Sequence, residues 1–110
     1  MPTLHVDVPI EQIEAFCRKW KVREFALFGS VLREDFGPDS DVDVLVTFDE
    51  DAPWSLLDLV EAQYELEELF GRKVDLVEKK SIRNPFRRHS ILTTKQVIYG
   101  DTPNRDEGDV

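Results

Sequence analysis

The segment that most constrains the fold is Asp-Val-Asp-Val-Leu-Val-Thr-Phe at residues 41–48. Neighbouring side chains of a β-strand point to opposite faces, so the valines at positions 42, 44 and 46 share one face and require a core. Asp41 and Asp43 share the other face, about 7 Å apart at Cα. Two carboxylates at that spacing repel each other unless a cation neutralises them. The segment therefore predicts a strand with one buried face and a divalent-cation position on the other.

A third carboxylate strengthens this hypothesis. Residues 73–78 predict a second strand in which Val74 and Leu76 share one face and Asp75 occupies the other. If the two strands pair, Asp75 approaches Asp41 and Asp43. Three carboxylates can hold two magnesium ions about 4 Å apart, an arrangement suited to phosphoryl chemistry. Asp75 can also accept the proton of an incoming hydroxyl group.

Gly29 and Ser30 supply a candidate anion site next to this strand. Residues 22–28 are rich in β-formers and predict a strand that ends at Gly29, where the backbone can approach a ligand closely. Ser30 opens a predicted short helix over residues 31–35, whose first amides favour an anion. The serine hydroxyl can donate a further hydrogen bond to phosphate. A phosphate-binding turn thus precedes the acidic strand, with ten residues between Ser30 and Asp41.

The remaining pattern completes the fold prediction. Further elements are a helix over 9–20, a turn at 37–40, a helix from a Ser55–Asp58 capping box to Phe70, a helix opening at 84–85 and a strand over 96–99. The order α-β-β-α-β-α-β predicts a single α/β (α+β) domain over residues 1–100, with helices packed on a mixed sheet of about four strands. Residues 101–110 form a polar tail that we expect to be disordered.

Composition narrows the class of protein. The chain has 110 residues and a formal net charge of −9, which disfavours direct nucleic-acid binding and suits a basic protein partner. The single cysteine, Cys17, lies on the apolar stripe of the first helix and reads as core. We find no membrane-length apolar run and no signal peptide, so we expect no membrane association and a cytoplasmic location. P-loop and Rossmann glycine motifs are missing from the sequence.

Other interpretations of the same residues stay open. Asp39, Asp41, Asp43 and Glu50 have the spacing of a calcium-binding EF-hand loop, although valine stands where the loop requires glycine. The acidic pair could also simply end a strand in solvent. Arg33 could contact phosphate or pair with a neighbouring acid. The basic patch, which consists of Arg83, Arg87, Arg88 and His89, could be a solvated helix face or could contact phosphate or a partner protein.

The pattern Gly-Ser, ten residues, Asp-x-Asp resembles the minimal nucleotidyltransferases of the DNA polymerase β superfamily. The longer string, which adds Arg33 and Pro38-Asp39-Ser40 before Asp41, is similar to their antitoxin branch, the MNT antitoxins encoded beside a HEPN-domain RNase toxin. The likeness is strongest over residues 27–48 and also includes the Asp75 strand. It implies that Asp41, Asp43 and Asp75 are catalytic and bind magnesium. It implies nucleotide binding by Gly29, Ser30, Arg33 and Ser40.

The resemblance also implies a reaction. It predicts an antitoxin nucleotidyltransferase that moves AMP from Mg-ATP to a tyrosine hydroxyl of the HEPN toxin and so inactivates it. The chain is small, which favours an acceptor carried by another macromolecule. Two alternatives stay open. The chain could neutralise the toxin by masking it without catalysis, or it could be a nucleotidyltransferase subunit that acts on a small molecule.

Overall fold

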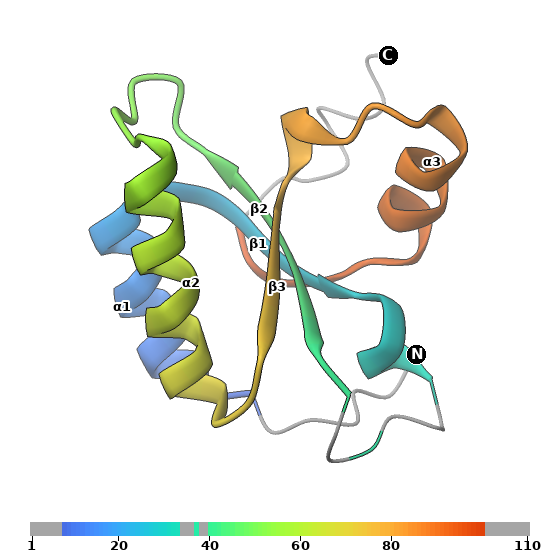
Figure 1. Ribbon diagram of the computed structural model, residues 1–110, viewed down its shortest axis with the longest axis horizontal. Coiled ribbons are helices and arrows are strands. Elements are labelled where there is room, and N and C mark those ends of the chain that lie inside the picture. Colours follow the sequence, from blue (N-terminus) through green and yellow to red (C-terminus); the bar gives the residue numbers. More distant parts are fainter. Residues whose placement is uncertain (1–7, 34–36, 38–39, 101–110) are drawn as a thin grey trace.

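The computed structural model describes residues 8–33, 37 and 40–100, and its elements follow the predicted order (Figure 1). The predicted tail over 101–110 lies outside the described residues and stays a prediction. The elements are α1 (Ile10–Trp20), β1 (Val22–Phe28), the 3-10 turn η1 (Gly29–Leu32), β2 (Val42–Phe48), α2 (Leu56–Phe70), β3 (Val74–Glu78), the 3-10 turn η2 (Lys79–Ser81), α3 (Pro85–Thr94) and β4 (Gln96–Tyr99).

The four strands form one mixed sheet in the order β3-β2-β1-β4. β1 pairs antiparallel with β2 and with β4, whereas β2 pairs parallel with β3. The parallel pair follows from the connection between its strands, because a parallel neighbour needs a long crossover and α2 supplies it. The fold prediction of a small mixed sheet with packed helices is confirmed.

Helices cover both faces of the sheet. In Figure 1, α1 and α2 lie together on one side and α3 lies on the other. The larger core joins α1 and α2 to the even-numbered valines of β2, which are buried as their alternation predicts. The smaller core joins Ile91 of α3 to Phe28 of β1 and Leu45 of β2. The predicted core position of Cys17 is confirmed, and burial raises the pKa of its thiol to about 12.

Local signals fix the helix ends. Ser55 and Asp58 form the predicted capping box at the start of α2, and Gly71 ends that helix in the left-handed region at φ 69°. Asn84 caps α3 by accepting two backbone hydrogen bonds, and Pro85 occupies its first turn. The 15 residues of α2 make it the longest of the described helices, none of which has the length and apolar character to cross a bilayer.

The helix predicted over residues 31–35 is wrong in its bounds. η1 is a single 3-10 turn that starts at Gly29, and the amide of Arg33 closes it by donating to the carbonyl of Ser30 at 3.0 Å. The backbone of Arg33 is then extended, with φ −103° and ψ 150°. An extended residue cannot continue helical hydrogen bonding, so the turn ends there.

A buried ion pair joins Lys95, the residue between α3 and β4, to Glu24 of β1. The ammonium of Lys95 donates to Glu24 Oε2, and the two side chains are only 4% and 10% exposed. We expect Lys95→Met to lower the free energy of unfolding by about 3 kcal/mol, because Glu24 would stay buried without its charged partner. Urea unfolding measures this loss. Lys80→Met is the matched control, since the Lys80–Glu78 pair has an 84% exposed lysine and should contribute less than about 1 kcal/mol. Equal losses in both variants would contradict the assignment.

Candidate functional site

Strand pairing brings the predicted carboxylates together. In the parallel β2–β3 ladder, Asp43 is the direct register partner of Asp75. Adjacent strands lie about 4.8 Å apart, so the two side chains stand side by side on one face of the sheet. Asp41 lies one residue before β2 and is exposed, as is Asp75. The strand of Asp75 does pair beside that of Asp43, which is the condition under which Asp75 was expected to approach the other two carboxylates.

Ser30 holds the acidic strand against the turn. Its backbone amide donates to Asp43 Oδ2 at 3.3 Å, and its hydroxyl donates to the carbonyl of Asp41 at 2.9 Å, with Asp43 Oδ2 also near at 3.4 Å. These bonds tie η1 to the beginning of β2. The amide and the hydroxyl of Ser30 both donate to the segment that contains Asp41 and Asp43. Phosphate binding by Ser30 stays a prediction.

Gly29 is required by the space beside Asp43. Its φ of +69° lies in the left-handed region, and a Cβ built on it would collide with Asp43 Oδ2. Any other residue would therefore strain the backbone and displace the carboxylate. In this structure the group beside the Gly29 backbone is the side chain of Asp43, and the close approach of Gly29 to a ligand stays a prediction.

Asp43 lies close enough to Asp75 and Asp41 for their charges to act on it. Burial raises the pKa of Asp43 above its ordinary value, and the charges of Asp75 and Asp41 raise it further. The two hydrogen bonds from Ser30 act in the opposite direction. Among the described residues, no three Asp, Glu, His or Cys side chains are arranged to hold a metal ion as they stand. Asp43 is turned toward Ser30, whereas Asp41 and Asp75 extend from the exposed surface.

The structure gives Ser40 a local role. Its hydroxyl accepts a hydrogen bond from the amide of Gly37 at 3.1 Å, and its own amide donates to the Gly37 carbonyl at 3.0 Å. These bonds close the turn predicted at 37–40. Nucleotide binding by Ser40 stays a prediction, as it does for Arg33, whose side chain is exposed beyond η1. Asp39 lies outside the described residues.

Arg72 holds the turn before Asp41 in place, a role that the sequence did not indicate. Its guanidinium donates to the carbonyls of Gly37 at 2.9 Å and Ser40 at 3.2 Å. The side chain therefore links the end of α2 to the turn that leads into Asp41. The partners are 35 and 32 residues away in sequence, and no local pattern could have paired them.

The EF-hand alternative is wrong. Residues 42–48 form a continuous strand in the middle of the sheet, with neighbours on both sides. An EF-hand loop instead turns sharply around its ion at this point. The completely buried Val44 occupies the position at which that loop needs glycine.

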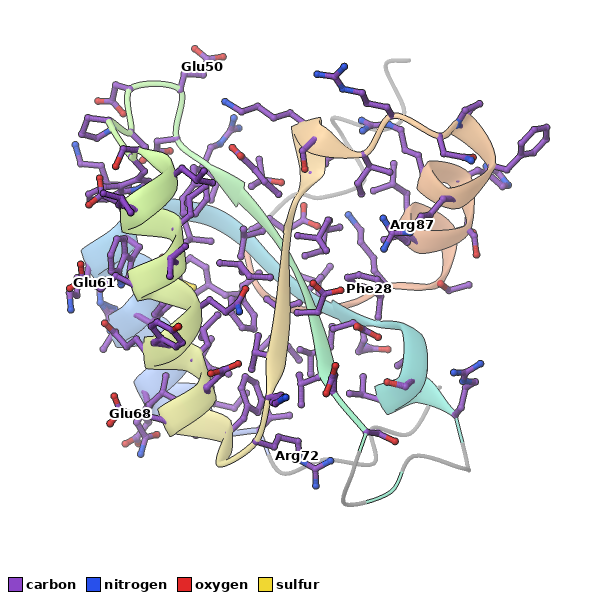
Figure 2. The ribbon with its side chains drawn as sticks, in the orientation of Figure 1. Phe28, Glu50, Glu61, Glu68, Arg72 and Arg87 are labelled. Atoms are coloured by element: carbon purple, nitrogen blue, oxygen red, sulfur yellow. The ribbon has the colours of Figure 1, made fainter. Side chains whose placement is uncertain are left out.

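The four residues of the predicted basic patch differ in their environments: Arg88 is half-buried, and the other three are exposed. Arg88 donates to the carbonyl of Lys79 at 3.0 Å and so ties α3 to η2. Arg87 is exposed and lies one helical turn before Ile91, which packs on the sheet face that carries Asp43. In Figure 2, Arg87 extends from α3 toward the sheet, above the labelled Phe28. Arg83 and His89 are exposed.

The sequence profile of the family described as Nucleotidyltransferase domain matches residues 10–98. A protein of Methanocaldococcus jannaschii, provisionally named a protein adenylyltransferase, is 47% identical over 81 residues that cover 74% of this chain and 79% of that protein. The protein adenylyltransferase MntA of Thermococcus cleftensis is 42% identical over 81 residues, 74% of this chain and 77% of MntA. The chain therefore belongs to the nucleotidyltransferase domain family, and its substrate is a nucleotide.

Solved structures support the same fold. A chain from the complex of a tri-AMPylated Shewanella oneidensis HEPN toxin with an MNT antitoxin superposes with a TM-score of 0.62. The match has 19% identity and covers 88% of this chain and 74% of that chain. At this identity the likeness establishes the fold alone, and that fold is the minimal nucleotidyltransferase arrangement expected from the Gly-Ser and Asp-x-Asp pattern.

The raised pKa of Asp43 yields a stability prediction. A carboxyl group whose folded pKa is raised stabilises the fold most below its unfolded pKa, and that contribution is lost as the pH rises through the folded pKa. Asp43→Asn removes the charge but keeps an oxygen that can accept from Ser30. We expect its Tm at pH 7, without divalent ions, to exceed that of the wild type by roughly 2–4 °C, with the gain shrinking toward pH 4. Asp51→Asn, in an exposed turn, is the control. A less stable Asp43→Asn at every pH would contradict the assignment.

The collision at Gly29 yields a second prediction. Gly29 and Gly71 share a φ of +69°, but nothing lies within 4 Å of a Cβ added at Gly71. Gly71→Ala should therefore lower the free energy of unfolding by about 1 kcal/mol, because only the left-handed backbone conformation is unfavourable for alanine there. Gly29→Ala should lower the free energy of unfolding by about 1 kcal/mol more than Gly71→Ala does, because it also displaces the Asp43 carboxylate. Urea unfolding of the two variants gives the difference, and equal losses would show that the collision is relieved without cost.

Proposed function

We propose that this chain is a protein adenylyltransferase that acts as an antitoxin, moving AMP from Mg-ATP to a tyrosine hydroxyl of a HEPN RNase toxin. The observation that carries the proposal is the pairing of Asp43 with Asp75 at the turn held by Gly29 and Ser30, within a nucleotidyltransferase domain. The names of its relatives and the AMPylated toxin in the Shewanella oneidensis complex support the acceptor and the transferred group.

The donor set fits magnesium. Asp41, Asp43 and Asp75 are hard carboxylate ligands. Burial raises the pKa of Asp43, the charges of Asp75 and Asp41 raise it further, and a divalent cation would relieve the repulsion between these charges. When bound, one or two magnesium ions would neutralise the triphosphate and stabilise the attacking and leaving oxygens. The exposed Asp41 and Asp75 side chains have freedom to turn toward such ions, while Ser30 fixes Asp43.

In the proposed reaction, the phenolic oxygen of the acceptor bonds to the α-phosphorus of ATP. The bond from that phosphorus to the oxygen bridging to the β-phosphate breaks, and pyrophosphate leaves. Asp75 takes the phenolic proton. Gly29, Ser30, Arg33 and Ser40 would orient the nucleotide on the side of the turn. Because Asp41 and Asp75 lie on an exposed face, a tyrosine carried by a folded partner has access to the site.

The direct test is intact-mass spectrometry of the purified HEPN partner after incubation with this chain, ATP and magnesium. We expect the partner to gain the mass of one or more AMP units, and we expect no gain when EDTA replaces magnesium. Asp41→Asn and Asp43→Asn should abolish the gain, and Asp75→Asn should slow it roughly 100-fold or more. Asp51→Asn, an exposed aspartate outside the cluster, should transfer at the wild-type rate.

The masking alternative makes the opposite prediction. A chain that neutralises the toxin without catalysis would bind and inhibit it with no added mass, and Asp41→Asn and Asp43→Asn would protect as well as the wild type does. That pair of results would end the enzymatic proposal. Transfer of AMP to a small molecule, with no AMP added to the protein partner, would instead show that the acceptor is a small molecule.

A further inference from the structure

Helix α2 exposes large apolar side chains on the face opposite its core. Leu56 is 78% exposed, Leu57 80%, Val60 42% and Tyr64 62%. Residues 56, 60 and 64 follow one another at four-residue spacing and so form one stripe along the helix. The buried residues of α2, Ala62 and Leu66, lie on its other side. A contiguous apolar patch of this kind on a charged protein marks an interaction surface.

A groove runs between this stripe and the edge of the sheet. It has a volume of about 310 Å³, and Leu56 and Val60 of α2 form one wall while Leu76 of β3 and Phe48 lie opposite. β3 is an edge strand, because it is the terminal strand in the order β3-β2-β1-β4. The patch and the groove together form one largely apolar surface, which we name the α2–β3 surface; the polar residues Gln63, Glu78 and Ser81 also line the groove.

Acidic side chains border this surface along α2, and Glu78, which pairs with the exposed Lys80, lines the groove on the β3 side. Glu61 and Glu68 are exposed on α2 and project away from the sheet in Figure 2. The whole chain carries a formal net charge of −9. A second copy of the chain would bring two acidic rims together, which is repulsive. Residues 101–110 include four acidic side chains and Val110 as their one aliphatic residue, a poor match to an apolar groove with an acidic rim.

We propose that the α2–β3 surface docks an amphipathic helix of the partner protein, with an apolar stripe flanked by lysine and arginine residues. A ridge of side chains at four-residue spacing packs into the grooves of a second helix, and the basic flanks would face Glu61 and Glu68. This inference rests on the proposed function in one respect, since it takes the partner to be the HEPN protein that receives AMP.

The surface lies one strand away from the site. Asp75 and Leu76 are neighbours on β3 and therefore point to opposite faces of the sheet, one beside Asp43 and the other into the groove. A partner helix held along α2 would sit at the free edge of β3. From there, a neighbouring segment of the partner can reach around that edge to the carboxylates, so docking would place the acceptor hydroxyl within range of Asp75.

The test is calorimetric titration of the purified HEPN partner with the full chain, without ATP. We expect Leu57→Glu and Tyr64→Glu each to raise the Kd at least roughly tenfold, with unchanged Tm because both side chains are already exposed. Phe86→Glu is the matched control, since Phe86 is 85% exposed but lies on α3; its Kd should match that of the wild type. Glu61→Lys should slow association, with the difference shrinking at high salt.

The outcomes separate this inference from the proposed function. AMP transfer to the partner with Kd values unaffected by Leu57→Glu and Tyr64→Glu would overturn the docking surface and leave the function intact. Binding that depends on Leu57 and Tyr64, without any AMP transfer, would support the docking surface and overturn the proposed function. A dimer of the chain alone in sedimentation velocity, lost in Leu57→Glu, would assign the surface to a second copy. That result, like an absence of any binding by the wild type, would overturn the inference.

Discussion

The register of β2 between its two neighbours is the constraint on which the rest of the structure depends. Its even-numbered valines lie in the core beneath α1 and α2, and the residues between them face the other way. Because the parallel ladder aligns Asp43 with Asp75, a slip of one residue would both expose the valines and bury the acids. The hydrophobic effect that fixes the strand therefore also sets the position of the carboxylates.

The charged side chain of Asp43 lies where it does not contribute to the stability of the fold. Asp43 is partly buried beside two further carboxylates, and its raised pKa reflects that cost. Gly29 leaves room for the side chain, while Ser30 donates the hydrogen bonds that hold it. Such local strain is typical of functional sites that surrounding structure must support. Here the support comes from the core below β2 and from Arg72, which fixes the turn before Asp41.

Strand β3 connects the two surfaces that the proposals invoke. One face of it carries Asp75 beside Asp43, and the other carries Leu76 into the groove along α2. A nucleotidyltransferase with an open carboxylate face gains selectivity if a separate surface positions its protein substrate. In this chain the acidic rim of the α2–β3 surface would choose the partner by charge, while the Gly29–Ser30 turn and its carboxylates would carry out the chemistry.

By itself, the sequence determined the order of the elements, the alternation of β2, the α2 capping box and the family resemblance carried by Gly-Ser and Asp-x-Asp. These depend on local geometry and turn chemistry, which short segments encode. Tertiary structure alone decided the link from Arg72 to the turn before Asp41 and the Lys95–Glu24 pair. It also decided which apolar residues of α2 face solvent. Such features arise between residues far apart in the chain, and periodicity within one element carries no information about which distant surface will cover it.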